Sequence, residues 1–147
     1  MGWRKEDDWF WEGNVQRILE EFFRASGFEV IATDAIKKQQ GPDMLVSDGS
    51  RKILIEIKGW PAAKIADGPR QGQEKKAASA LQASHWFAGC LSTIIRRRKK
   101  FPDHELAIAF PMFNRYVSLL EESKWAIELL GIQVYLIKET KEVYKYL

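Results

Sequence analysis

The spacing of apolar residues predicts an amphipathic helix near the N-terminus, from about Asp8 to Ser26. Its apolar side chains recur every three or four positions, which gathers them on one helical face. They are Trp11, Val15, Ile18, Leu19, Phe22 and Phe23. Gly27 follows as a natural helix end because glycine accepts the left-handed conformation common there. Phe28 to Thr33 then alternates in side-chain character as a strand does.

Two apolar runs in the next part of the chain predict an antiparallel hairpin. The first is Met44 to Val46, and the second is the isoleucine-rich run from Lys52 to Lys58. Asp48-Gly49 lies between them and is a strong turn signal. We therefore expect the start of the first strand to lie beside the end of the second.

The second half of the chain predicts further helices and strands. Glycines and prolines from Gly59 to Gly72 predict a loop, which we expect to be the most flexible part of the molecule. A long helix should run from about Gln73 to Arg98, and a second one from Asn114 to Leu130. Leu106 to Phe110 and Ile132 to Ile137 predict buried strands. Candidate core residues of the first of these helices are Ala77, Leu81, Phe87, Leu91 and Ile94.

The order of predicted elements is helix, three strands, helix, strand, helix and strand. This order suits an α/β fold in which a central mixed β-sheet is flanked by helices on both faces. The length of 147 residues suits a single domain spanning 1–147, because a chain of this size already buries most of its apolar surface in one core. Lys138 to Leu147 is too short to assign.

Composition excludes several classes of protein. With 46% hydrophobic and 29% charged residues the chain matches an ordinary soluble globular protein. No apolar run is long enough to cross a bilayer, and the N-terminus lacks the apolar stretch of a secretory signal, so we expect a cytoplasmic protein without a membrane partner. Cys90 is the only cysteine, which excludes an internal disulfide and a zinc ribbon. We expect it to be buried in a helix.

Positive charge is concentrated in three blocks within a net charge of +3. They are Lys37-Lys38, Lys75-Lys76 and the run from Arg96 to Lys100. Such blocks can neutralise phosphates and release their counterions, which permits a nucleic-acid partner. Basic residues at the end of a helix also complement its dipole, so the charge alone leaves both interpretations open.

The candidate chemistry lies at Asp43, Glu56 and Lys58. Residues two apart in a strand share a face, so Glu56 and Lys58 should project together. The isoleucines Ile53, Ile55 and Ile57 should point the other way. The hairpin should then bring Asp43 beside them. Two neighbouring carboxylates repel each other unless a cation lies between them, and hard oxygen ligands suit Mg²⁺ or Mn²⁺. We predict a divalent metal on the two acids, with Lys58 holding or deprotonating a water molecule.

A Glu-x-Lys pair on an exposed strand face is also common without any function. Here, however, the strand is apolar on both faces, since Leu54 accompanies Glu56. Charged residues in such a strand need a compensating reason. Glu12 is a further candidate ligand, because its spacing from Val15 and Leu19 places it beside the inward face of the first helix. Gly13 next to it leaves room for close backbone approach.

These residues resemble the signature of the PD-(D/E)xK nuclease superfamily, which includes many restriction endonucleases and the archaeal Holliday-junction resolvases. Pro42-Asp43 and Glu56-Ile57-Lys58 match its motif, and Glu12 matches an acidic residue that many members carry on their first helix. The resemblance covers about the first three quarters of the chain. It implies a restriction endonuclease-like core (αβββαβ) with an added helix and strand, and Mg²⁺-dependent hydrolysis of DNA that leaves a 5′-phosphate.

One departure from the family concerns Gln82. Some exonuclease-like members carry Gln-x-x-x-Tyr on the helix after the motif, whereas here Gln82 is followed four positions later by Trp86. A catalytic role for Gln82 is therefore only a candidate. Other residues near the motif are candidates for contacting nucleic acid. Basic side chains can neutralise phosphates, and an aromatic ring can contact a substrate. They are Lys64, Arg70, Lys75, Lys76 and Trp60.

The sequence thus favours a metal-dependent DNA endonuclease. Two alternatives remain: a non-catalytic nucleic-acid-binding or assembly subunit that keeps the fold, and a small interaction protein without a nucleic-acid role. Cutting both strands of a duplex would favour a symmetric homodimer. His85 and His104 lack the partners of a histidine-metal nuclease, so we interpret them as structural or solvent-facing. For Trp11 the helical stripe favours core packing.

Overall fold

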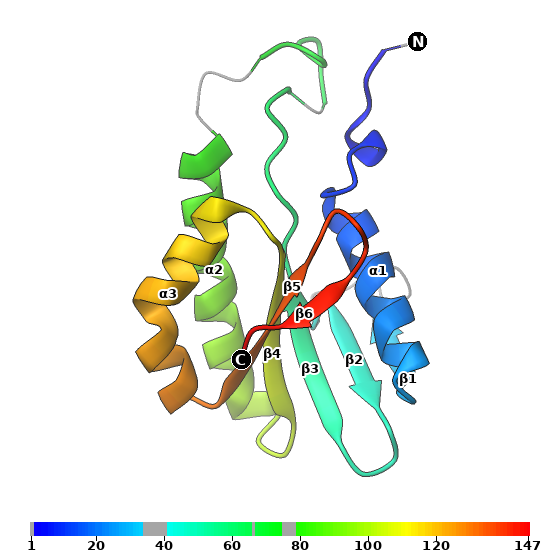
Figure 1. Ribbon diagram of the computed structural model, residues 1–147, viewed down its shortest axis with the longest axis vertical. Helices are drawn as coiled ribbons and strands as arrows, with labels where there is room; N and C mark the ends of the chain where they lie inside the picture. Colours follow the sequence, from blue (N-terminus) through cyan, green and yellow to red (C-terminus); the bar gives the residue numbers. More distant parts are fainter. Residues whose placement is uncertain (1, 34–40, 66, 75–78) are drawn as a thin grey trace.

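The computed structural model describes residues 2–33, 41–65, 67–74 and 79–147 (Figure 1). A β-sheet forms the centre of the described part of the molecule, with strand order β1-β2-β3-β4-β5-β6. Helix α1 covers one face, and α2 and α3 cover the other. The predicted α/β architecture is therefore present.

The bounds of the elements are close to those expected from the pattern of apolar residues. The strands are β1 (Glu29–Thr33), β2 (Met44–Ser47), β3 (Lys52–Ile57), β4 (Glu105–Pro111), β5 (Ile132–Ile137) and β6 (Val143–Lys145). The helices are the short 3₁₀ turn η1 (Lys5–Asp7), α1 (Glu12–Ala25), α2 (Ser79–Lys100) and α3 (Asn114–Leu129).

The sheet is mixed, as predicted. Strands β1, β2 and β3 form an antiparallel meander, β3, β4 and β5 run parallel, and β6 pairs antiparallel with β5. The αβββαβ order ends at β4, and α3 and β5 are the added helix and strand. The C-terminal segment, too short to assign from sequence, adds the further strand β6 at the edge of the sheet.

Two apolar layers sandwich β3. Its isoleucines Ile53, Ile55 and Ile57 pack toward α1, whereas Leu54 packs toward α2 and α3. This alternation follows from the strand period of two. Because Glu56 has the parity of Leu54, it belongs to the face covered by α2.

The start of α2 differs from the sequence-based prediction. Gln73 and Glu74 are outside the helix, because the chain there turns back on the preceding loop. The Ile65 amide donates to the Gln73 carbonyl at 2.8 Å, and Lys64 forms a β-bridge with Glu74. Such an antiparallel contact requires extended backbone, which is incompatible with a helix.

The inward face of α2 also differs from the predicted one. Leu81 is 56% exposed, so its assignment to the core was wrong, and Ala77 lies outside the described residues. Leu91 is partly buried against the core. The fully packed stripe is Ala83, Phe87, Cys90 and Ile94. The expectation that Cys90 is buried in a helix is thereby confirmed.

The N-terminal helix is shorter than predicted, because α1 begins at Glu12 and not at Asp8. Trp11 occupies the N-cap position with extended backbone and is only half-buried, so its assignment to the core was wrong. Val15 and Leu19 are fully buried, and Glu12, in the first turn, is half-buried. None of the helices in the described ranges has the length and apolarity to cross a bilayer.

Candidate functional site

The open end of the β2–β3 hairpin brings Asp43 beside Glu56. Met44 pairs with Ile55 in register, so Asp43, one residue earlier, lies next to Glu56, one residue later. A side-chain contact fixes this arrangement, because Oδ2 of Asp43 accepts a hydrogen bond from the Ile57 amide at 2.7 Å. The carboxylate of Asp43 therefore satisfies a backbone amide at the end of β3.

Glu56 is a buried carboxylate, with only 5% of the residue exposed. The Nε of Arg97, on α2, donates to Oε1 of Glu56 at 2.8 Å. A terminal nitrogen of the same guanidinium donates to the Gly41 carbonyl at 3.1 Å. Arg97 thus joins the two halves of the motif and supplies the charge that a buried carboxylate requires.

Sequence reasoning missed this role of Arg97, which it included in a basic block at the end of a helix. A signal was present, because the buried stripe at positions 83, 87, 90 and 94 continues to 97 with alternating steps of four and three. Residues at such steps share one helical face. Arg97 is therefore the basic residue of the block that the helix turns toward the sheet.

Lys58 follows β3 directly. Its amide donates to the carbonyl of Ala109 at 3.0 Å, so the backbone is still held against β4 at this point. The residue is half-buried. This hydrogen bond to a central strand fixes the backbone position of Lys58, whereas the backbone of a lysine in a loop is more mobile.

The buried thiol of Cys90, on α2, is affected electrostatically by the charged residues of the motif. Burial raises its pKa above the usual range for a thiol, and neighbouring carboxylates raise it further whereas a lysine lowers it. The charged groups that act on the thiol are, from largest to smallest effect, Glu56, Lys58, Asp43 and Glu12. All four residues predicted from the sequence therefore act electrostatically on this position of α2.

Gly59 brings the start of α1 against the end of β3. A Cβ atom at this position would lie 2.6 Å from both the amide nitrogen of Glu12 and the carbonyl oxygen of Phe10. The carbonyl of Gly59 accepts a hydrogen bond from the buried Tyr116 hydroxyl at 2.7 Å. Burial raises the pKa of this hydroxyl, so it remains a donor. The backbone of Glu12 therefore lies directly against the chain that follows Lys58.

The remaining candidates lie farther out. Gln82 lies in the first turns of α2 and is half-buried. Trp60 stacks on Phe113 with ring centroids 4.3 Å apart, so its role in covering the core edge is established. Lys64 forms the β-bridge with Glu74, and Arg70 is exposed in the loop between these two residues. Lys75 and Lys76 lie outside the described residues.

The two histidines are not part of this site. His85 is exposed on α2, and the ring of His104 packs edge-on against Phe101. Both positions agree with the interpretation of these residues as solvent-facing or structural.

The donor set suits a hard divalent cation. Within the described ranges no three His, Cys, Asp or Glu side chains are grouped closely enough to hold a metal ion. Mg²⁺ does not need such a group, because it keeps several of its waters and is commonly bound through one or two carboxylates. Asp43, directly before β2, and Glu56, on β3, are the candidates for those two.

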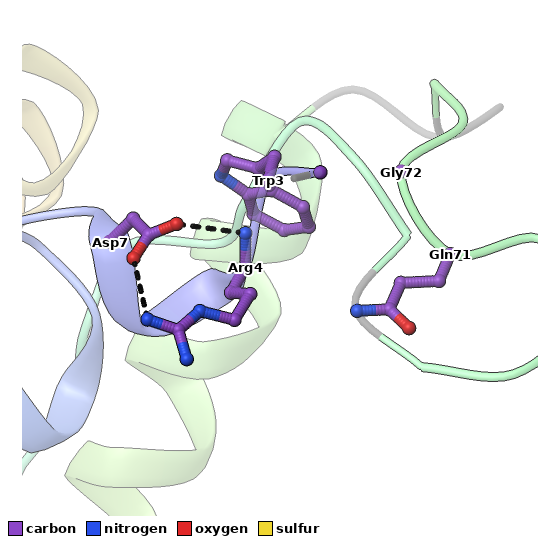
Figure 2. Close-up of a pocket in the computed structure, with 6 residues that line it drawn as sticks. Trp3, Arg4, Asp7, Gln71 and Gly72 are labelled. Carbon is purple, nitrogen blue, oxygen red and sulfur yellow. Dashed lines mark hydrogen bonds and ion pairs between the residues drawn. The ribbon is translucent and has the colours of Figure 1, made fainter.

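A wide cavity of about 690 Å³ opens between the N-terminal segment and the loop after β3 (Figure 2). Trp3, Arg4 and Asp7 lie on one side, and Gln71 and Gly72 lie on the other. Arg4 is engaged by Asp7 through both its amide and its guanidinium. This cavity contains none of the motif residues and does not contribute to the acidic site.

Comparison with known proteins identifies solved structures of similar fold. No family model and no curated protein matches the chain. An XisH family protein from Nostoc punctiforme is 14% identical, with a TM-score of 0.55 over 88% of this chain and 95% of its own. An fdxN element excision controlling factor protein from Anabaena variabilis is 15% identical, with a TM-score of 0.54 over the same shares. The likeness supports the α/β fold with a restriction endonuclease-like core.

Proposed function

We propose that this chain is a metal-dependent nuclease that hydrolyses phosphodiester bonds in DNA, acting as an endonuclease. Asp43 and Glu56 are the proposed ligands for Mg²⁺ or Mn²⁺, Glu12 supports them, and Lys58 serves the attacking water. The observation that carries the proposal is the buried Glu56 carboxylate, held beside the anchored Asp43 at the end of the hairpin. Burying a carboxylate beside another is costly, and a purely structural strand end would not need it.

The local balance of charge supports a cation at this point. The proposed site counts three carboxylates, of Glu12, Asp43 and Glu56, and two cations, of Lys58 and Arg97, so its formal charge is −1. Among the described residues, Arg97 donates to Oε1 of Glu56. The second oxygen is therefore the one we assign to the metal.

Each protein group has a separate task in this mechanism. A bound divalent cation would polarise a phosphoryl oxygen and lower the pKa of a water molecule. Arg97 donates a hydrogen bond to Glu56 and thereby fixes the orientation of its carboxylate. The Ile57 amide does the same for Asp43. The ammonium of Lys58 positions the attacking water and stabilises negative charge that develops on the phosphoryl group.

A cleavage screen tests this proposal. Linear, circular, branched and single-stranded DNA are incubated with Mg²⁺, with Mn²⁺ or with EDTA. Asp43→Asn and Lys58→Met should each lower the cleavage rate by about 100-fold or more. Lys52→Met is the matched control, because this exposed lysine lies at the other end of the same strand. Activity that survives in EDTA or in both site variants would refute the assignment.

Arg97 also favours a second candidate, a DNA-binding or assembly subunit that has kept the fold without catalysis. The Glu56 carboxylate already has a cationic partner in the structure, so a metal is not required to neutralise it. A similar structure is described as an excision controlling factor protein, a name that denotes control and not cleavage. Titration with Mn²⁺ followed by electron paramagnetic resonance separates the two. The nuclease binds Mn²⁺ and loses it in Asp43→Asn, whereas the subunit binds DNA but no Mn²⁺.

A further inference from the structure

A smaller cavity, of about 300 Å³, lies between the start of α1 and the segment that follows β3. Its lining includes Lys5, Asp8, Trp11, Glu12, Trp60 and Trp86. The backbone of Glu12 lies against Gly59, which directly follows Lys58. The cavity therefore borders the end of β3, where the proposed metal site lies.

Three indole rings reach this cavity from three different elements. Trp11 is the N-cap of α1, Trp60 follows β3, and Trp86 lies on α2. Packing holds two of them in place. Phe113 stacks on Trp60, and the ring of Trp11 lies over Gly13, where a Cβ atom would come within 2.2 Å of it.

Two of these rings lack an aromatic partner. Neither Trp11 nor Trp86 stacks on another ring in the part of the chain that the structure describes, and Trp86 is 36% exposed. Large aromatic rings that are left partly open to solvent commonly form binding surfaces. The cavity thus provides flat aromatic walls without a partner from the protein itself.

The polar groups of the lining restrict which kind of ligand the cavity can bind. Lys5 provides a cation, which is also bridged to Asp67 in the loop at 3.7 Å, and the carboxylates of Asp8 and Glu12 provide hydrogen-bond acceptors. A volume of about 300 Å³ is at the small end of ligand sites. A flat heterocycle with amino groups and an attached phosphate fits this lining. Its ring would stack on the aromatic walls, its amino groups would donate to the carboxylates, and its phosphate would be attracted by Lys5. A lipid chain or an apolar peptide would leave the charged groups unpaired.

We propose that this aromatic cavity holds one unstacked nucleobase of the DNA strand whose phosphate lies at Asp43 and Glu56. The inference rests on the proposed nuclease function and adds the substrate class to it. A base within a closed duplex is covered by its neighbours and must leave the stack before it enters such a cavity. The substrate is therefore DNA with an unpaired base next to the cleaved bond, as in a single strand, a branch or a frayed end.

Binding measurements in EDTA test the cavity separately from catalysis. Fluorescence anisotropy is recorded with a labelled single-stranded oligonucleotide, with its fully paired duplex and with the same strand carrying abasic sites. We expect the intact single strand to bind most tightly. Trp86→Ala should weaken its binding by about 5- to 100-fold, because stacking on one aromatic ring is lost. Trp86→Phe should restore most of the affinity, since a ring is kept.

Trp125→Ala is the matched control, because this tryptophan on α3 is 73% exposed and does not line the cavity. Circular dichroism checks that each variant is folded. Equal binding of the abasic strand, or unchanged affinity in Trp86→Ala, would overturn the inference even if the protein cleaves DNA. If the protein binds single strands through Trp86 but cleaves no DNA with any metal, the proposed function fails and the base-binding cavity stands.

Discussion

The Nε of Arg97 on α2 lies 2.8 Å from Oε1 of Glu56 on β3, and this ion pair joins the helical layer to the centre of the sheet. The side chain of Glu56 is 7% exposed and that of Arg97 is 23% exposed. Loss of either partner would leave the other charge poorly solvated, and such losses are strongly destabilising.

The Arg97→Met variant should accordingly be less stable by about 3 kcal/mol, near the lower end of the usual range because the guanidinium is partly exposed. Urea unfolding measures the change, and Arg96→Met on the exposed face serves as the control. If Glu56 binds a metal, millimolar Mg²⁺ should recover part of the lost stability in Arg97→Met. A variant as stable as the parent would show that the ion pair contributes nothing.

Substitution of Asp43 should separate its structural role from its proposed metal-binding role. Asp43→Asn keeps an oxygen that can accept a hydrogen bond from the Ile57 amide, whereas Asp43→Ala loses this hydrogen bond. The alanine variant should lose about 1 to 3 kcal/mol of unfolding free energy, and the asparagine variant clearly less. Cleavage should be abolished in both. Equal stability of the two variants would mean that the hydrogen bond does not hold the strand end.

Gly59→Ala should displace the start of α1. The added methyl group would lie 2.6 Å from backbone atoms of Phe10 and Glu12, which cannot move independently of the helix. We expect a loss of about 1 to 3 kcal/mol in unfolding free energy together with reduced cleavage. Gly89→Ala on α2 is the control, because nothing lies within 4 Å of its added Cβ and it should stabilise the helix slightly. Wild-type behaviour of Gly59→Ala would show that Glu12 does not depend on this contact.

Cys90 should be inert in the folded protein. The residue is 1% exposed, and burial raises the pKa of its thiol, so almost none of the reactive thiolate is present near pH 8. Labelling with Ellman's reagent should be very slow in buffer and rapid in urea. Rapid labelling of the native protein would indicate that the α2–sheet interface opens.

The Arg51–Glu105 pair predicts a small dependence of stability on pH. The hydrogen bond from Arg51 holds the pKa of Glu105 below its ordinary value of about 4.3. A carboxylate with a lowered folded-state pKa stabilises the fold above its unfolded-state value, and this stabilisation is lost as the pH falls through the folded-state value. Glu105→Gln should therefore reduce the loss of stability on acidification below about pH 4.3. Because both side chains are more than a third exposed, the effect should be small. If Glu105→Gln loses as much unfolding free energy on acidification as the parent protein, the pairing is contradicted.

The amino-acid sequence by itself determined the features that depend on neighbours along the chain. Strand and helix periods gave most element positions, and the Asp48-Gly49 turn fixed the hairpin that places Asp43 beside Glu56. Strand parity alone placed Glu56 on the face of Leu54. These features are local because backbone geometry and hydrogen-bond register decide them over a few residues.

Tertiary packing decided the rest. Arg97 meets Glu56 only because α2 crosses β3 after a connection of more than twenty residues, and no local rule fixes where a helix crosses a sheet. Trp11 and Trp86 line one cavity for the same reason. The helix predicted to start at Gln73 begins later because that residue pairs with an earlier part of the loop. Long-range contacts supply both the cation that holds Glu56 and the aromatic walls beside it, since each joins segments distant in sequence.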